Sequence, residues 1–127
     1  MAQAGFPKKL RLLNAADYKA VFSGAQFKVS CRHFLILAIS TPAASPRLGL
    51  VIAKKNVSKA VHRNRIKRLI RNSFRLNQSL LASLDIVVLA RQKSDSLENN
   101  VIDEKISVLW SDLQNKSKQA GISKASQ

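Results

Sequence analysis

The sequence has little cysteine, few acidic residues and no long hydrophobic run. Among its 127 residues there is one cysteine, Cys31, which excludes an internal disulfide and fits a reducing compartment. No apolar run approaches the roughly 18–20 residues of a membrane span. The basic N-terminus is not followed by the apolar segment of a secretory signal. We therefore expect a soluble, cytoplasmic protein with no membrane partner.

Acidic residues are scarce where a protein-borne active site would need them. No Asp or Glu lies between Asp17 and Asp85, and five of the seven acids lie in the segment 95–112. A metal-dependent nuclease needs converging carboxylates to hold its ions. The four glycines are too dispersed to form a phosphate-binding loop, and His33 and His62 have no metal-ligand spacing with the cysteine. We expect no catalytic residue and no metal ligand in this chain.

The positive charge is concentrated in the first two thirds of the chain. The formal net charge is +15, and residues 1–84 hold sixteen Lys or Arg against one acid, whereas residues 85–127 hold six against six. The segment 54–75 alone carries nine Lys or Arg and no acid. Such a group of cations repels itself unless a polyanion neutralises it. Nucleic acid is the favoured partner, because a membrane-binding helix would need apolar residues that the core uses here.

The 46% hydrophobic content and its pattern predict a folded α/β protein. We expect helices over 15–23, 57–77 and 98–115, and strands over 26–30, 33–40, 47–53 and 85–91. A proline-containing loop separates the strands at 33–40 and 47–53, which favours an antiparallel hairpin. The strand–helix–strand order that follows favours a parallel pair between 47–53 and 85–91.

The composition divides the chain into three parts. Residues 14–115 are expected to form one domain. Residues 1–13 are expected to be a basic, mobile arm, and residues 116–127, rich in Ser, Lys and Gln, a frayed tail.

The helix expected over 57–77 has an apolar side and a basic side. Its apolar side comprises Ile66, Leu69, Ile70, Ser73 and Phe74, and its polar side Asn64, Lys67, Arg68, Arg71 and Arg75. Arginine pairs bidentately with phosphate and stacks on bases, as RNA recognition requires. A solvated helix face is the alternative, but the absence of nearby acids removes its usual salt bridges. The basic side is therefore interpreted as a nucleic-acid surface. For Asn64 on this side, a nucleic-acid contact and a solvated position are equally consistent with the sequence.

A second candidate surface comes from an aromatic pair. Tyr18 and Phe22 are spaced i, i+4 and share a helix face. Such a pair is more often part of a core, although aromatics at a sheet edge can stack single-stranded bases. Lys54 and Lys55 stand just before the basic helix and fit either solvation or phosphate contact.

Two consecutive segments, RLGLVIAKK at 47–55 and AVHRNRIKRLIRNSFR at 60–75, resemble the signature of the bacterial ribonuclease P protein component. The resemblance covers the whole chain. It implies an α/β (α+β) two-layer sandwich, with a four-stranded mixed sheet, three helices and a left-handed crossover around the basic helix. A left-handed crossover would be an exception to the general right-handed preference of such connections.

The resemblance also implies a function. A protein of this family is a subunit of an endoribonuclease that hydrolytically removes the 5′ leader of precursor tRNA and so generates the mature 5′ end. The catalytic RNA subunit supplies the active site and holds most of the Mg²⁺. The implied partners are this RNA and precursor tRNA, and no obligate protein partner is expected.

Residue roles carry over by position. The residues matching those that contact the RNA subunit are Arg63, Asn64, Arg65, Lys67, Arg68, Arg71 and Arg75. Those matching the leader-binding cleft are Tyr18, Phe22, Lys54 and Lys55. Two departures stand out: Leu37 replaces an aromatic that many members place in the cleft, and 56–58 lacks the glycine that many have after the Lys-Lys pair.

Two other functions share the charge pattern. A structural ribosomal protein would have the same small size and basic composition. A DNA-binding module would place the helix at 57–77 in a major groove.

Overall fold

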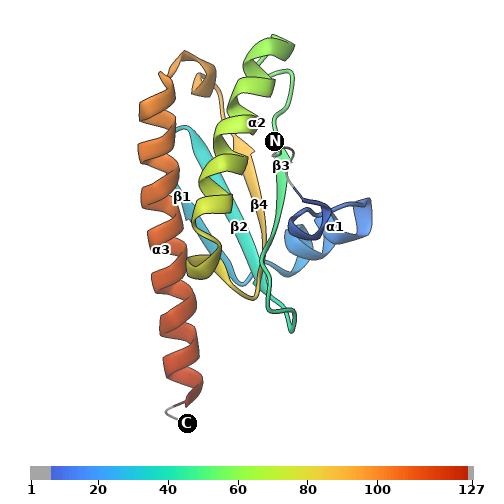
Figure 1. Ribbon diagram of the computed structural model, residues 1–127, viewed down its shortest axis with the longest axis vertical. Helices are drawn as coiled ribbons and strands as arrows, with labels where there is room; N and C mark the ends of the chain where they lie inside the picture. The colour runs from blue at the N-terminus through green and yellow to red at the C-terminus, as the bar shows by residue number, and fades with distance from the viewer. Residues whose placement is uncertain (1–6, 126–127) are drawn as a thin grey trace.

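Four strands form one mixed sheet at the centre of the molecule (Figure 1). They are β1 (Phe27–Ser30), β2 (Phe34–Ser40), β3 (Arg47–Val51) and β4 (Leu84–Ala90), in the spatial order β1-β2-β4-β3. β4 runs antiparallel to β2 and parallel to β3. This computed structural model describes residues 7–125.

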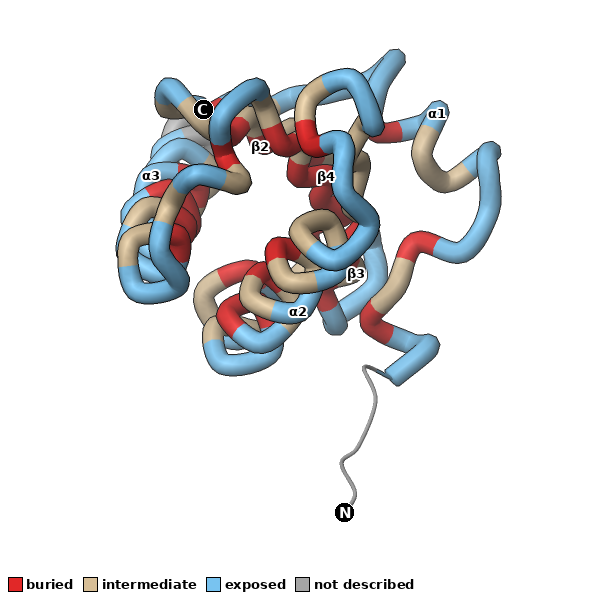
Figure 2. Tube along the Cα trace, turned by 90° about the horizontal axis from the view of Figure 1, so that it is seen from above, coloured by how far each residue is buried: buried red, intermediate tan, exposed pale blue. Residues whose placement is uncertain are grey.

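Three helices cover the two faces of the sheet. They are α1 (Ala15–Gly24), α2 (Ala60–Leu76) and α3 (Asn99–Ala125). Seen from above, α2 and α3 lie on one side of the strands and α1 on the other (Figure 2). The side chain of Asn14 accepts a hydrogen bond from the Asp17 amide at 2.9 Å and so caps the start of α1. The expected four-stranded sheet with three helices is confirmed.

Most of the core lies between the sheet and the pair α2–α3. Burial alternates along β2, so Phe34, Ile36 and Ala38 face this core. Trp110 packs edge-on against Phe74, with ring centroids 5.9 Å apart, and its indole N–H donates to the Ser73 hydroxyl at 2.9 Å. A smaller cluster under α1 is built on Leu12, Val21 and Val87.

The strand order corrects one prediction and confirms another. The expected hairpin between β2 and β3 is wrong, because β4 lies between them. β4 is buried along almost its whole length, and a strand with no exposed face gains most from neighbours on both edges. The parallel pairing of β3 with β4 is confirmed.

The connection from β3 to β4 is left-handed. In Figure 1 β3 runs upward, α2 descends in front of the sheet, and β4 runs upward on the left of β3. A right-handed crossover would have placed β4 on the right. The hand implied by the resemblance is therefore the one observed.

The two ends of the chain differ from expectation. Leu10 and Leu12 are only 2% and 5% exposed, and the Leu12 amide donates to the Leu48 carbonyl at 3.0 Å beside β3. Residues 10–12 therefore pack beside β3, whereas Lys8, Lys9 and Leu13 are exposed and 1–6 lie outside the described residues. α3 continues to Ala125, well beyond the expected end at 115. Within the described chain no helix is long and apolar enough to cross a membrane.

Candidate nucleic-acid interface

The basic helix begins later than its sequence pattern predicts, and an arginine holds the preceding loop. α2 starts at Ala60, while Val57 is fully buried. The N-cap residue, Lys59, has no side-chain capping bond. One Arg63 amino group, Nη1, donates to the carbonyls of Val57 at 3.0 Å and Ser58 at 2.8 Å. Arg63 thus fixes the entry into α2 from inside the chain.

Arg65 binds a segment thirty to thirty-four residues away. Its Nη1 donates to the Leu97 carbonyl at 3.2 Å and to the Asn99 side chain at 2.6 Å, and its Nη2 donates to the Asp95 carbonyl at 3.0 Å. These acceptors lie in the loop after β4 and at the start of α3. Arg65 therefore links α2 to this loop by hydrogen bonds. The spacing of residues in the sequence does not predict this role.

The remaining polar side of α2 faces outward. Asn64, Arg68 and Arg75 are exposed, and Lys67 is half-buried. Arg75 bonds the side chain of its neighbour Asn72 at 2.7 Å. Neither ion pair seen among the described residues involves α2. The exposed cations of this helix therefore have no acid of the described chain to neutralise them.

Arg71 is half-buried, unlike the exposed Arg68 and Arg75. Burial, and secondarily the positive charge of Arg11, lowers the pKa of its guanidinium, while Tyr18 acts in the opposite direction. A guanidinium keeps its charge throughout the physiological range even with a lowered pKa. Arg71 therefore carries positive charge toward the N-terminal segment and Tyr18. It connects the two candidate surfaces predicted separately from the sequence.

Of the two aromatic residues on α1, Tyr18 is packed against β3 and Phe22 is exposed. The Tyr18 hydroxyl accepts a hydrogen bond from the Leu50 amide at 3.3 Å. Its ring lies over Gly49, where a Cβ atom would come within 2.7 Å of the ring. Phe22 is 45% exposed. Tyr18 thus joins α1 to β3, whereas much of the Phe22 ring remains exposed.

The sheet face beside α1 is apolar and only half covered. Leu35, Leu37, Val51 and Leu89 are half-buried on it, and three of them pack against the small cluster under α1. Leu37 offers an apolar surface where a stacking aromatic is absent. This face is therefore aliphatic over the strands and aromatic where α1 borders it.

Lys54 and Lys55 are exposed in the turn after β3. The missing glycine costs this turn nothing, because none of the residues 56–58 has a positive φ. Val57 fills the core at this point, and the Asn56 side chain donates to the Ala90 carbonyl at 3.0 Å. The turn is therefore fixed against β4.

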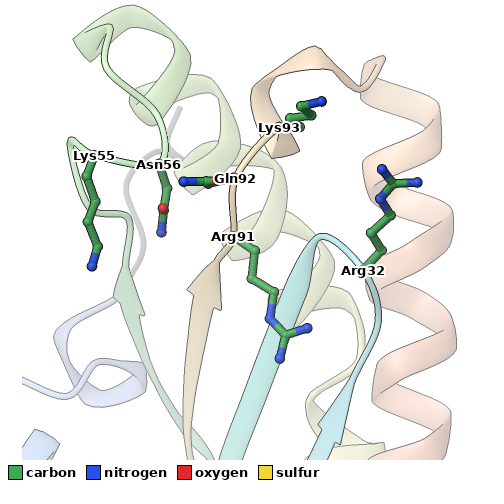
Figure 3. A pocket seen from close by; sticks show the side chains of 6 residues that line it. All are labelled: Arg32, Lys55, Asn56, Arg91, Gln92 and Lys93. Carbon is green, nitrogen blue, oxygen red and sulfur yellow. The ribbon is translucent and has the colours of Figure 1, made fainter.

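A pocket of about 540 Å³ opens beside this turn (Figure 3). Its lining residues are Arg32, Lys55, Asn56, Arg91, Gln92 and Lys93. Only Lys55 was a candidate from sequence. The others come from three separate segments, so their proximity appears only once the strand order is known.

Comparison with known proteins agrees with these features. The family model Ribonuclease P matches residues 6–114. The ribonuclease P protein component of Chromohalobacter salexigens is 46% identical over 110 residues, which cover 87% of this chain and 86% of that protein. That of Pseudomonas aeruginosa is 49% identical over 110 residues, covering 87% and 82%.

Solved structures give the same result. The RNase P protein of Staphylococcus aureus matches with a TM-score of 0.73 and 29% identity, covering 79% of this chain and 91% of that one. The RNase P protein of Thermotoga maritima matches with a TM-score of 0.69 and 28% identity, covering 79% and 94%. The resemblance found in the two sequence motifs is confirmed, and the ribosomal and DNA-binding alternatives gain no support. This chain belongs to the ribonuclease P protein family and is a protein subunit for processing the 5′ end of tRNA.

Proposed function

We propose that this subunit acts through two surfaces, of which one docks on the catalytic RNA and the other holds the 5′ leader of precursor tRNA. The observation that carries the proposal is the outward side of α2, whose exposed cations have no acidic partner among the described residues. An RNA backbone would neutralise this charge and release its own counterions. The apolar side of the same helix is anchored by Ile66, Ile70 and Phe74, so the cations are held on a rigid support.

The residues of the RNA-binding motif divide into two roles. Asn64, Arg68 and Arg75 are exposed and would contact the RNA, with Lys67 beside them. Arg63 and Arg65 use their guanidinium groups within the chain and would position the helix instead. This division refines the prediction from sequence, in which all of these residues contact the RNA.

The leader would lie on the sheet face beside α1. Phe22 offers an exposed ring for base stacking, while Tyr18 and the aliphatic floor supply apolar contact. Lys54 and Lys55 would neutralise leader phosphates at the end of β3, and Arg71 would add charge where α2 approaches Tyr18.

The chemistry of cleavage would belong to the RNA subunit, which would hold most of the Mg²⁺. Within the described residues no three His, Cys, Asp or Glu side chains gather into a metal-binding group. The contribution of this chain is therefore binding and orientation, and by reducing repulsion between the two RNAs it would lower the Mg²⁺ needed for cleavage.

Reconstitution tests this function. The purified protein alone should leave precursor tRNA uncut, whereas adding it to the RNA subunit should lower the Mg²⁺ and salt concentrations needed for cleavage. Cleavage by the protein without RNA, persisting after a further purification step that removes contaminating nucleases, would contradict the proposal.

Two neighbouring arginines provide a matched pair for the docking face. Arg68→Gln should reduce the slope of log affinity for the RNA subunit against log salt by roughly one unit, because one phosphate contact is lost. Its free energy of unfolding should stay unchanged. Arg65→Gln removes the same charge but loses three internal hydrogen bonds, and should lower the free energy of unfolding by about 2 kcal/mol. An unchanged slope in Arg68→Gln would mean that this side chain is only solvated.

Phe22 distinguishes the leader surface from the docking surface. Phe22→Ala should weaken binding of precursor tRNA to the holoenzyme by roughly 1–3 kcal/mol, the usual value of one base–aromatic stack. Binding of mature tRNA, which has no leader, should not change. Competition between the two tRNAs measures the difference, and equal losses for both would return Phe22 to a packing role.

A further inference from the structure

The basic pocket beside β3 and β4 has a composition that the two surfaces above do not explain. Four of its six lining side chains are cationic, namely Arg32, Lys55, Arg91 and Lys93, and no acid lines it. It opens where the neighbouring parallel strands β3 and β4 end. Crevices outside the carboxyl ends of such strands are a usual location for ligands in open α/β sheets.

Hydrogen bonds fix the part of the pocket that carries its two arginines, Arg32 and Arg91. The Arg91 amide donates to the His33 carbonyl at 2.9 Å, and Nη1 of Arg91 donates to the Cys31 carbonyl at 2.9 Å. Arg91 thus holds the residues on both sides of Arg32. Only one of its guanidinium nitrogens is used in this way, so the fork remains able to bind an anion.

The backbone that carries Lys93 is fixed as well. Lys93 has a φ of 69°, a left-handed conformation that is uncommon outside glycine. The hydroxyl of Ser96 donates to the Lys93 carbonyl at 2.6 Å, and Arg65 holds the Asp95 carbonyl beside it. In the segment after β3, the Asn56 side chain donates a hydrogen bond to the Ala90 carbonyl. These hydrogen bonds therefore fix the three backbone segments that carry the cations around the pocket (Figure 3).

This concentration of charge selects among anions. A passing RNA strand presents a single charge per phosphodiester linkage. A terminal triphosphate concentrates several charges on adjacent phosphorus atoms. The neutral amides of Asn56 and Gln92 in the same lining can donate to further phosphate oxygens. Nearby His33 adds no charge at neutral pH, because burial, followed by Lys105 and Arg32, lowers its pKa.

We propose that this pocket binds the 5′-terminal triphosphate of an RNA, and so recognises the unprocessed end of a primary transcript. The inference rests on the proposed function to the extent that the leader supplies this end. Lys55 lines the pocket and also belongs to the proposed leader surface, so a leader held on that surface would reach the pocket beside Lys55. Recognition of the terminal triphosphate would favour primary transcripts over precursors already trimmed by another nuclease.

The first experiment uses the full chain without RNA and inorganic tripolyphosphate as the probe. Calorimetry at constant ionic strength should show that tripolyphosphate binds more tightly than monophosphate or sulfate. Arg32→Gln and Lys93→Asn should each weaken this binding roughly tenfold. Asparagine tolerates the left-handed backbone conformation at position 93, so the Lys93→Asn variant should keep the native fold. Lys118→Gln removes one exposed charge from α3 and should change the affinity less than twofold. Equal losses in all three variants, or no preference for tripolyphosphate, would overturn the proposal.

The second experiment uses the holoenzyme and one precursor tRNA prepared with a 5′-triphosphate, a 5′-monophosphate or a 5′-hydroxyl, over a series of leader lengths. The triphosphate precursor should bind several-fold more tightly at the lengths that reach the pocket, and Lys93→Asn should abolish the difference. Equal binding of the three ends at every length would overturn the assignment to RNA ends. Cleavage of the 5′-hydroxyl precursor tests the subunit function separately, because it needs no triphosphate.

Discussion

Replacing Asp85 with alanine should lower the free energy of unfolding by about 3 kcal/mol, near the low end of the range for removing one partner of a buried ion pair. Asp85 is 5% exposed and receives two hydrogen bonds from Arg47, from Nε at 3.0 Å and from Nη2 at 2.7 Å. The hydrogen bond to Asp85 is also the main reason why the pKa of Arg47 is raised. The low end applies because about a third of the Arg47 side chain remains exposed.

The effect should extend to α1. Arg47 also lies 3.5 Å from the Asp17 carboxylate, and Asp17 accepts a hydrogen bond from the Leu13 amide at 3.2 Å. Losing Asp85 therefore loosens the residue that ties α1 to the sheet. Urea denaturation measures the stability change, and Asp112→Ala, an exposed acid on α3, is the control. A loss in Asp85→Ala no larger than in this control would contradict the argument.

Gly49→Ala should be the most damaging small substitution on the proposed leader surface. An added Cβ would lie 2.7 Å and 2.8 Å from two ring atoms of Tyr18 and 3.0 Å from Leu12. Two walls of the site would have to shift, because the ring is also held by its bond to Leu50. Such overpacking costs about 1–3 kcal/mol. We expect both lower stability and weaker preference for precursor over mature tRNA.

A second glycine provides the matched control. At Gly24 an added Cβ would meet only Ile39, at an ordinary distance of 3.9 Å, and the residue has no positive φ. Gly24→Ala should therefore be neutral or slightly stabilising. In a double-mutant cycle, Tyr18→Leu should recover part of the stability lost by Gly49→Ala. Additive losses would show that the Gly49–Tyr18 contact is not the cause.

Local patterns in the sequence predicted the elements better than their arrangement. The apolar run that forms β2 and the two sides of α2 are properties of neighbouring residues, and both elements are observed. The position of β4 between β2 and β3 depends on competition among strands distant in sequence, which no local pattern contains. The expected hairpin failed for this reason.

The candidate site follows the same rule. The motif around α2 identifies the helix proposed to dock on RNA, and Tyr18 and Phe22 identify the helix beside the proposed leader surface. The use of Arg65 inside the chain depends on acceptors thirty to thirty-four residues away. Arg32 and Arg91 line one pocket only because the loop between β1 and β2 lies beside the end of β4. The sequence therefore identifies the candidate residues, whereas the partner that each arginine side chain binds is known only from the fold.

The central place of β4 also sets an order of events during synthesis. The chain must be translated through Ala90 before β3 acquires a strand partner and before β2 acquires its second one. Until then the polycationic α2 segment leaves the ribosome without the completed sheet on which it packs. Because these pairings span large separations in sequence, sheet closure is expected to be slow relative to helix formation. A nascent chain stopped before residue 84 should remain sensitive to protease, and one extended past α3 should become resistant.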